Sequence, residues 1–288
     1  MIKISKIVKN LIRKLLPIIY CINRLIWLIS RSNHGYLRIL IYHHIPDNRM
    51  EIFKKQMVYL QRKYNVVDFV EAKKMLENKS RIIGANILVT FDDGFYSNYI
   101  AAKEILEPLG IKAIFFVVTN FIRDYDQEQL VLNLKNILGK NDYSQKREFF
   151  PMSWQELKEL KDAGHTIGSH TASHLDCSNI SLDEDINYQL KISKEVLEEH
   201  LQCSIECFAF PFGSIQSFNC KLLNDALANY NYVFTGIRGN NNKESRVIWR
   251  DVVTLCSDSN VDIRFIIEGG LSMFYLKPRW MVKKMLEV

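Results

Sequence analysis

The chain has 288 residues, 48% of them hydrophobic, which is enough for one large domain with a substantial core. Its formal net charge of +6 is concentrated near the amino end, because residues 1–31 carry seven basic side chains and no acid. Removing these seven from the 38 basic residues leaves 31 against 32 acidic ones, so the remainder is close to neutral. A nucleic-acid-binding protein spreads basic groups over its working surface, and this class is therefore excluded.

Residues 1–31 also carry apolar side chains in steps of three and four, which predicts an amphipathic helix. Pro17, Asn23 and Arg24 interrupt the apolar run and no small-residue cleavage site follows, so no cleavable signal peptide is expected. A spanning helix needs about 20 apolar residues. We therefore predict a basic helix, kinked near Pro17, that lies in an anionic membrane interface and makes the chain a peripheral protein of a bacterial cytoplasmic membrane. A helix packed on the domain or on a partner is the alternative.

Apolar runs bounded by turn residues predict strands along the rest of the chain. The runs are residues 37–42, 87–91, 112–118, 165–169, 205–210, 230–235 and 247–253. Helical patterns lie between them, at residues 51–63, 69–76, 99–106, 153–164 and 181–201, and capping boxes open the last two. This alternation predicts an α/β protein with a mainly parallel sheet. Residues 120–150 fit no strand–helix unit and are expected to form an insertion beside the cleft.

Acidic and imidazole side chains follow the ends of two predicted strands. Asp92 and Asp93 come directly after the strand at residues 87–91, and His170 and His174 follow the strand at residues 165–169. One carboxylate with two imidazoles is a three-ligand metal set that leaves positions open for water and substrate. The neighbouring carboxylate stays free to accept a proton. Because strand ends gather at one rim of such a sheet, the sequence predicts metal-assisted hydrolysis there.

Four ordered blocks of the chain resemble those of the polysaccharide deacetylase family (carbohydrate esterase family four, with a chitooligosaccharide-deacetylase-like domain). The blocks are the acid pair at residues 90–94, the histidine pair at 169–174, the aromatic–Pro–aromatic–Gly motif at 208–213 and the Tyr-His strand at 39–44. The last block is similar to the opening strand of the exopolysaccharide-processing members. The resemblance covers roughly residues 36–255, the expected catalytic domain, and implies a distorted, incomplete (β/α) barrel. The amphipathic helix predicted at residues 1–31 precedes this domain as a terminal helix.

The resemblance also implies a role for each side chain at the site. Asp92 is expected to be the general base. Asp93, His170 and His174 are the expected ligands of a divalent metal, with zinc as the first choice and cobalt, nickel or iron as alternatives. The backbone N–H of Phe212 is the expected oxyanion donor. No further cofactor is implied.

Two features depart from the family pattern. Many members carry an arginine two residues before the proline of the third block, where it orients the catalytic base, and this chain has Ala209 there. Arg250 is the predicted substitute, and a surface arginine at a strand start is the alternative reading. The usual C-terminal histidine acid is also missing. Members that open with Tyr-His nominate His43 as general acid, with His44 as the second choice.

The carboxyl end, residues 256–288, is expected to be a tail of basic and aromatic residues on the same anionic surface as the amino-terminal helix. The six cysteines form no Cys-x-x-Cys pair and are expected to be reduced and buried. His34 and His165 are expected to be structural.

These patterns predict a metal-dependent hydrolase that removes N-acetyl groups from amino sugars of a glycan or a lipid-linked glycan precursor. Hydrolysis of O-acetyl esters on a polysaccharide is the alternative within enzymes. From another class, the chain could be a catalytically inactive, membrane-associated glycan-binding protein. The intact set of acids and histidines argues against inactivity, and the alanine at residue 209 argues mildly for it. No oligomeric state is predicted.

Overall fold

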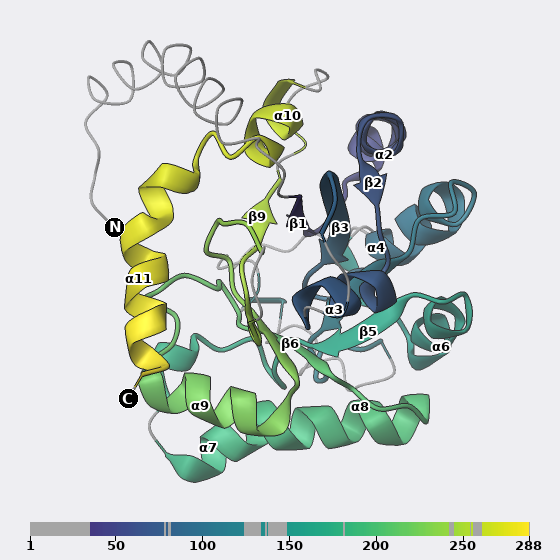
Figure 1. Cartoon of the computed structure of the whole chain (residues 1–288). Helices are drawn as coiled ribbons and strands as arrows, with labels where there is room; N and C mark the ends of the chain where they lie inside the picture. Colours follow the sequence, from purple (N-terminus) through teal and green to yellow (C-terminus); the bar gives the residue numbers. More distant parts are fainter. Residues whose placement is uncertain are drawn as a thin grey trace, which may run out of the picture.

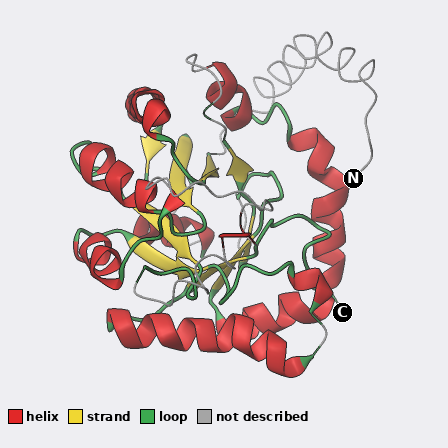
Figure 2. Cartoon of the chain, turned by 180° about the vertical axis from the view of Figure 1, so that it is seen from behind, coloured by secondary structure: helices red, strands yellow, loops and turns green. Residues whose placement is uncertain are grey.

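The computed structural model describes residues 35–77, 79, 82–123, 134–135, 137, 149–180, 182–241, 245–253, 255 and 261–287. Within these residues a curled sheet of nine strands forms the centre of the molecule, and all its paired strands run parallel. Helices surround this sheet, as both views show (Figures 1 and 2). The predicted helix at residues 1–31, His34 and most of the predicted insertion at residues 120–150 lie outside the described residues.

The strands follow one another around the curl in the order β8-β7-β6-β5-β4-β3-β1-β9, and β2 pairs with β3 beside this path. They are β1 (Tyr36–Tyr42), β2 (Asn65–Val66), β3 (Ala85–Phe91), β4 (Ala113–Val117), β5 (Thr166–Ser169), β6 (Cys207–Ala209), β7 (Tyr232–Phe234), β8 (Val247–Ile248) and β9 (Asp251–Val252). The first and last strands of this order, β8 and β9, are separated by only two residues, so the curled sheet nearly closes on itself. The predicted distorted, incomplete (β/α) barrel is confirmed.

One predicted strand is wrong in detail, because residues 247–253 form two short strands rather than one. Between them Trp249 and Arg250 leave the sheet: the Trp249 N–H donates to Asn241 Oδ1, and the Arg250 N–H donates to the carbonyl of Ile237. The chain therefore changes partner strand at this point, from β7 to β1. The break places the Arg250 side chain inside the barrel.

The helices between the strands include all the predicted ones and one more α-helix, at Cys220–Asn229, that the sequence pattern does not predict. They are η1 (Asp47–Arg49), α2 (Met50–Lys63), α3 (Phe69–Leu76), α4 (Tyr96–Ala101), η2 (Ala102–Leu106), α6 (Trp154–Asp162), η4 (Cys177–Asn179), α7 (Asp183–Asn187), η5 (Tyr188–Ile192), α8 (Ser193–Leu201), α9 (Cys220–Asn229), α10 (Val261–Ile267), η6 (Ser272–Tyr275) and α11 (Leu276–Met285). Ser153 and Glu156 form the predicted capping box of α6. Ser181 of the second predicted box lies outside the described residues, and Leu182 is the N-cap of α7. Helix α4 starts three residues before the predicted position.

Two apolar layers hold the barrel together. The larger layer packs the outer face of the sheet against the surrounding helices. The smaller layer fills the barrel interior, where strand residues such as Phe116 and Phe234 share a cluster with Phe69, Ala72 and Leu76 of α3. Helix α3 also bonds to residues near the starts of β6 and β7. It therefore closes the amino-terminal end of the barrel and leaves the carboxyl-terminal strand ends for a site.

The carboxyl-terminal segment packs against the barrel through one face only. Ile263, Ile267 and Val282 are fully or almost fully buried in the larger apolar layer, whereas Leu276 and Trp280 on α11 are exposed. Helix α11 runs along the outside of the molecule (Figure 1). In the part of the chain that the structure describes, no helix has the length and apolar content needed to cross a membrane.

His165 behaves as the structural residue that the sequence predicts. Its Nδ1 accepts a hydrogen bond from the Ala113 N–H, and its ring packs edge-on against Phe115. Burial, with smaller effects from two nearby lysines, lowers its pKa to about 4. The ring is therefore neutral near pH 7, because burial disfavours the charged form of an imidazole. The cysteines at 177, 203, 207 and 220 are free thiols.

Candidate active site

The predicted site residues gather at the carboxyl-terminal rim of the barrel, where parallel strands of this kind present their chemistry. Each follows the end of a strand. They are His43 after β1, Asp92 and Asp93 after β3, His170 and His174 after β5, Phe212 after β6 and Arg250 between β8 and β9.

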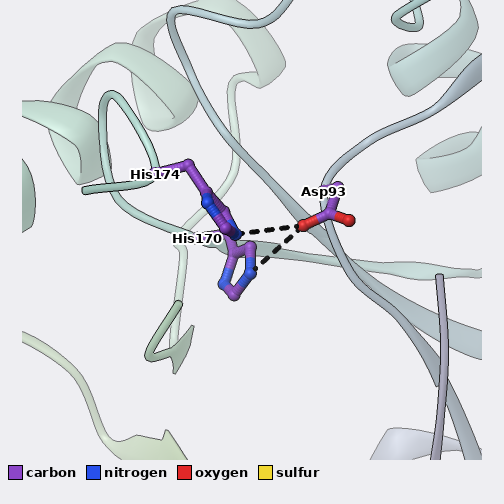
Figure 3. Close-up of side chains that lie close together, drawn as sticks. All are labelled: Asp93, His170 and His174. Atoms are coloured by element: carbon purple, nitrogen blue, oxygen red, sulfur yellow. Dashed lines mark ion pairs between the residues drawn. The ribbon is translucent and has the colours of Figure 1, made fainter. Parts of the chain in front are cut away.

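Asp93, His170 and His174 form a buried cluster that is suited to a metal ion (Figure 3). Asp93 Oδ1 lies 3.5 Å from His170 Nε2 and 3.3 Å from His174 Nε2, and all three residues are at most 4% exposed. Yet Oδ1 makes no hydrogen bond among the described residues, because these approaches are poorly aligned. The three atoms converge on a common point instead of bonding to each other. Among the described residues, no other set of histidine, cysteine or acidic side chains does this.

The two distances from Asp93 Oδ1 match those between neighbouring ligands of a zinc ion. Two ligands of a tetrahedral ion with bonds of about 2.1 Å lie roughly 3.4 Å apart, close to the observed 3.3 and 3.5 Å. One carboxylate and two imidazoles also match the nitrogen and oxygen ligands that such an ion takes. The residues present therefore fit the metal that the sequence predicts.

Four residues of the site adopt the left-handed backbone region, which is unfavourable for side chains other than glycine. They are Asp93, Thr171, His174 and Phe212, with φ of 79°, 69°, 54° and 60°. Strain of this kind costs of the order of 1–3 kcal/mol per residue and persists only where the surroundings enforce it. Here the loop after β5 is enforced by hydrogen bonds from Ala172 and Ser173 N–H to Gln189 Oε1 at 3.1 Å each.

A backbone contact orients His170. Its Nδ1 lies 2.8 Å from the carbonyl oxygen of Ala209, so Nδ1 carries the proton and Nε2 presents a lone pair toward Asp93. Burial lowers the pKa of His170, but the negative charges of Asp92 and Asp93 raise it by more. For the acid Asp93, burial raises the pKa. The interactions of Asp93 with His170 and His174 outweigh this and hold its pKa well below the usual range. The cluster therefore keeps its carboxylate ionised.

Arg250 clamps Asp92 through a bidentate ion pair. Arg250 Nη1 lies 2.7 Å from Asp92 Oδ1 and Nη2 lies 2.9 Å from Oδ2, while Nε donates to the carbonyl of Thr235. The guanidinium carbon is 5.0 Å from the centre of the Phe116 ring, and Arg250 is only 1% exposed. The alternative reading of Arg250 as a surface arginine is therefore wrong. Burial raises the pKa of Asp92, but its interactions with Arg250, together with the charges of His170 and His43, lower it below the usual range.

The two adjacent histidines after β1 differ in their surroundings. His44 points into the protein: its Nδ1 lies 3.0 Å from Ser97 Oγ, and its ring packs against Phe95 and Phe149. His43 is exposed at the rim. Burial raises the pKa of Asp92, yet the charges of Arg250, His170 and His43 lower it, so His43 lies within electrostatic reach of the site. The choice of His43 over His44 as general acid stays a prediction.

Phe212 presents both its ring and its backbone to the site. Its ring is 57% exposed and lies edge-on to His174, with the ring centres 5.0 Å apart. In the described part of the chain its N–H has no hydrogen-bond acceptor, whereas the next residue, Gly213, is anchored by bonds to Pro211 and Gly236. The N–H of Phe212 is thus available to a ligand.

Sequence reasoning missed Gln189, which holds the metal loop. Gln189 is 4% exposed and lies in η5, a π-helical turn, from which Nε2 also donates to Ser173 Oγ. Such turns often occur at functional sites. Nothing in the sequence around residue 189 distinguishes it from an ordinary position on a solvated helix face, so no local signal could have found it.

A sequence model of one family matches the chain, and it carries the description polysaccharide deacetylase. The match covers residues 83–232. This span includes Asp92, the three residues of the metal cluster and Phe212, but neither His43 nor Arg250. The chain is also 25% identical over 191 residues to YxkH of Bacillus subtilis (strain 168), whose own assignment as a polysaccharide deacetylase is provisional. The aligned part is 64% of this chain but only 60% of that curated relative.

Solved structures with the same fold cover most of the chain. IcaB from Ammonifex degensii is 24% identical, with a TM-score of 0.62 over 81% of this chain and 97% of the other. A de-N-acetylase from Aggregatibacter actinomycetemcomitans is 15% identical, with a TM-score of 0.63 over 81% of this chain and 100% of the other. At these identities the likeness is one of fold.

Proposed function

Because the chain belongs to the polysaccharide deacetylase family, we propose that it is a metal-dependent hydrolase that removes N-acetyl groups from amino sugars of a glycan or a lipid-linked glycan precursor. The convergence of Asp93, His170 and His174 beside a second buried carboxylate, Asp92, is the observation that carries the proposal. The ligand set favours zinc, with cobalt, nickel or iron as alternatives.

Each residue of the site has a part in amide hydrolysis. Asp93, His170 and His174 would hold the ion, which when bound acidifies a water and polarises the acetyl carbonyl. Asp92, kept ionised by Arg250, accepts a proton from the attacking water. The N–H of Phe212 donates to the oxygen that gains negative charge.

An N-acetyl group is the proposed target because the site also offers a proton donor. A departing amine needs a proton, and the exposed His43 at the rim can supply one. The Aggregatibacter neighbour, which shares the fold, is a de-N-acetylase. The test is acetate release from a panel of N-acetylated and O-acetylated oligosaccharides, with and without added zinc. We expect metal-dependent release from the N-acetylated members. Release from the O-acetylated members alone would indicate an esterase, and glycan binding without release from any member would indicate an inactive binding protein.

Loss of His43 should slow amide hydrolysis far more than hydrolysis of an activated ester. An amine leaves only when protonated, whereas nitrophenolate leaves without a proton, so His43→Ala should cost about 10²-fold on the amide and little on the ester. The measurement is the ratio of the two kcat values. His44→Ala is the matched control: it removes packing against Phe95 and should lower stability without changing this ratio. Equal loss on both substrates would instead make His43 a residue that shapes the cleft.

The location of the chain is proposed to be an anionic membrane surface. The sequence pattern of residues 1–31 supports this, as does α11, where the exposed Leu276 and Trp280 lie among the basic residues Lys277, Lys283 and Lys284. Apolar and aromatic side chains flanked by lysines are typical of helices that lie in the membrane interface.

Deletion of residues 1–30 should weaken binding to anionic vesicles while leaving hydrolysis of a soluble substrate largely intact. Each of the basic residues lost could contribute about 1 kcal/mol near an anionic surface, so binding of the full chain should fall sharply as salt rises. Co-sedimentation with phosphatidylglycerol vesicles at low and high salt measures this for both proteins. If the full chain ignores the vesicles at low salt, this segment is a packing or partner surface instead.

A further inference from the structure

A second hollow lies on the outside of the barrel, between α11 and the strand edge. It measures about 480 Å³, and its polar lining comes from Arg38, Asn240, Ser245, Ser272, Arg279 and Lys283. Arg38 on β1 lies five residues before His43, which follows the end of that strand, so the Arg38 end of the hollow lies roughly 16 Å from the rim that carries the catalytic cluster. None of its lining residues belongs to that cluster.

Positive charge at this hollow exceeds negative charge. Arg38 Nη1 lies 2.9 Å from Asp251 Oδ2, and Arg238 Nη1 lies 3.5 Å from the other oxygen, so two guanidinium groups share one buried carboxylate. Arg279 and Lys283 add two more cationic groups on α11. Among the described residues, Asp251 is the one acid paired with any of these four cations. A buried guanidinium group such as that of Arg38 is stable only when its charge is compensated.

Part of this charge is buried without a hydrogen-bond partner. Arg38 is 3% exposed, yet its Nε makes no hydrogen bond in the described part of the chain. Its Nη2 donates to Ser272 Oγ at 3.0 Å, and Arg279 Nη1 donates to the Ser272 carbonyl at 3.2 Å, so both guanidinium groups meet at one serine. Gly269 allows this approach, because a Cβ there would come within 2.7 Å of Arg38 Nη2.

Repulsion from Arg38 also affects the ionisation of Arg279. Burial lowers the pKa of Arg279, and the positive charge of Arg38 lowers it further, while Asp251 compensates only in part. The Arg279 side chain is bonded to the carbonyls of Arg238 and Ser272 and to no carboxylate that the structure describes. An anion placed between Arg279 and Lys283 would relieve this repulsion.

We infer that this hollow is a binding site for a phosphate group. Guanidinium groups bind phosphate oxygens through paired, charge-assisted hydrogen bonds, and a lysine adds a mobile point charge. A multivalent anion offsets more of the excess charge than a chloride or a single carboxylate does. The volume of about 480 Å³ lies within the range of small-molecule sites, so there is room for more than the phosphate itself.

Two sources could supply this chemistry, namely the phosphate of a lipid headgroup and a soluble phosphate. Leu276 and Trp280 on the outer face of α11 are 63% and 58% exposed, and Lys283 on the same helix lines the hollow. A headgroup phosphate could therefore enter while apolar side chains contact the bilayer. The test has a separate arm for each source.

The first arm measures binding of inorganic phosphate and pyrophosphate to the full chain by calorimetry. Arg279→Gln and Lys283→Gln should each weaken binding about tenfold, because each removes one charge-assisted contact. Lys277→Gln is the matched control, since Lys277 is exposed on the same helix and does not line the hollow. If phosphate instead bound at the catalytic cluster, its affinity would be the same in all variants. Absence of binding, or equal binding in the pocket and control variants, overturns the inference.

The second arm repeats the comparison with phosphatidylglycerol and phosphatidylcholine vesicles. A larger loss of anionic vesicle binding in Lys283→Gln than in Lys277→Gln supports a headgroup as the source, because both variants lose one charge near the membrane but only Lys283 lines the hollow. Equal losses of vesicle binding together with weakened pyrophosphate binding support a soluble phosphate. Acetate release from a soluble oligosaccharide should be the same in all variants. The two proposals can therefore fail separately, because the hollow is remote from the catalytic cluster.

Discussion

Replacing His174 with alanine should remove both the bound metal and the hydrolytic activity, whereas Asp92→Asn should remove the activity alone. His174 supplies one of three converging ligand atoms, and two remaining ligands make a weak site. Loss of a residue that only hydrogen-bonds to a metal ligand costs about 10–100-fold in metal affinity, so loss of the ligand itself should cost more. Asp92 lies beside the cluster but contributes no ligand atom to it. Losing the proton acceptor should lower kcat by about 10²–10⁴-fold with the metal retained.

Metal content after dialysis, measured by mass spectrometry beside kcat, separates the two roles. His170→Ala should behave as His174→Ala does. His200→Ala is the control, because His200 is an exposed histidine on α8 that stacks on Trp154 away from the strand ends. Circular dichroism shows whether each variant is folded. A folded Asp92→Asn protein that has lost its metal would mean that the roles of the two aspartates are reversed.

The geometry of the metal cluster could be predicted from the sequence because strand ends determine it. An apolar run that stops at Phe91 fixes where Asp92 and Asp93 emerge, and parallel strands bring their carboxyl ends to one rim whatever the length of the intervening chain. Two histidines four residues apart then need only follow a strand of the same sheet. For this part of the site, local patterns and the rule for parallel sheets agree.

The remaining parts depend on contacts that sequence patterns do not encode. The break in the last strand follows from bonds of Trp249 and Arg250 to Asn241 and Ile237, which lie in the preceding connection and show no strand or helix pattern. The closure of the amino-terminal barrel end by α3 depends on which face of the sheet becomes the interior. Gln189 supports the metal loop from a helix sixteen residues beyond it. Each of these is a tertiary contact, so the resemblance could nominate Arg250 but could not show how it reaches Asp92.

Adding Ala209→Arg to the Arg250→Ala variant should restore part of the activity that Arg250→Ala removes. Arg250→Ala leaves Asp92 buried without its partner, which typically costs about 3–5 kcal/mol of stability when one member of a buried pair is deleted. A misplaced base should also lower kcat by about 10²-fold with little effect on KM. Ala209 pairs with Phe234 across β6 and β7 and shares the barrel interior with the rings that flank Arg250. An arginine at residue 209 would enter the space that Arg250 leaves.

The double variant Arg250→Ala with Ala209→Arg should therefore gain about tenfold in kcat over Arg250→Ala, since a recovered charge-assisted contact corresponds to about one such factor. The contact from His170 to residue 209 should survive, because it uses the backbone carbonyl. Arg250→Lys is the control for charge alone: it keeps the positive charge but cannot form the bidentate pair, so it should fall between Arg250→Ala and the wild type. Metal content and melting temperature are measured on every variant. A double variant that is folded and metal-loaded but no faster than Arg250→Ala would show that the direction from which Asp92 is held matters, and that an arginine at residue 209 cannot do the work of Arg250 in this barrel.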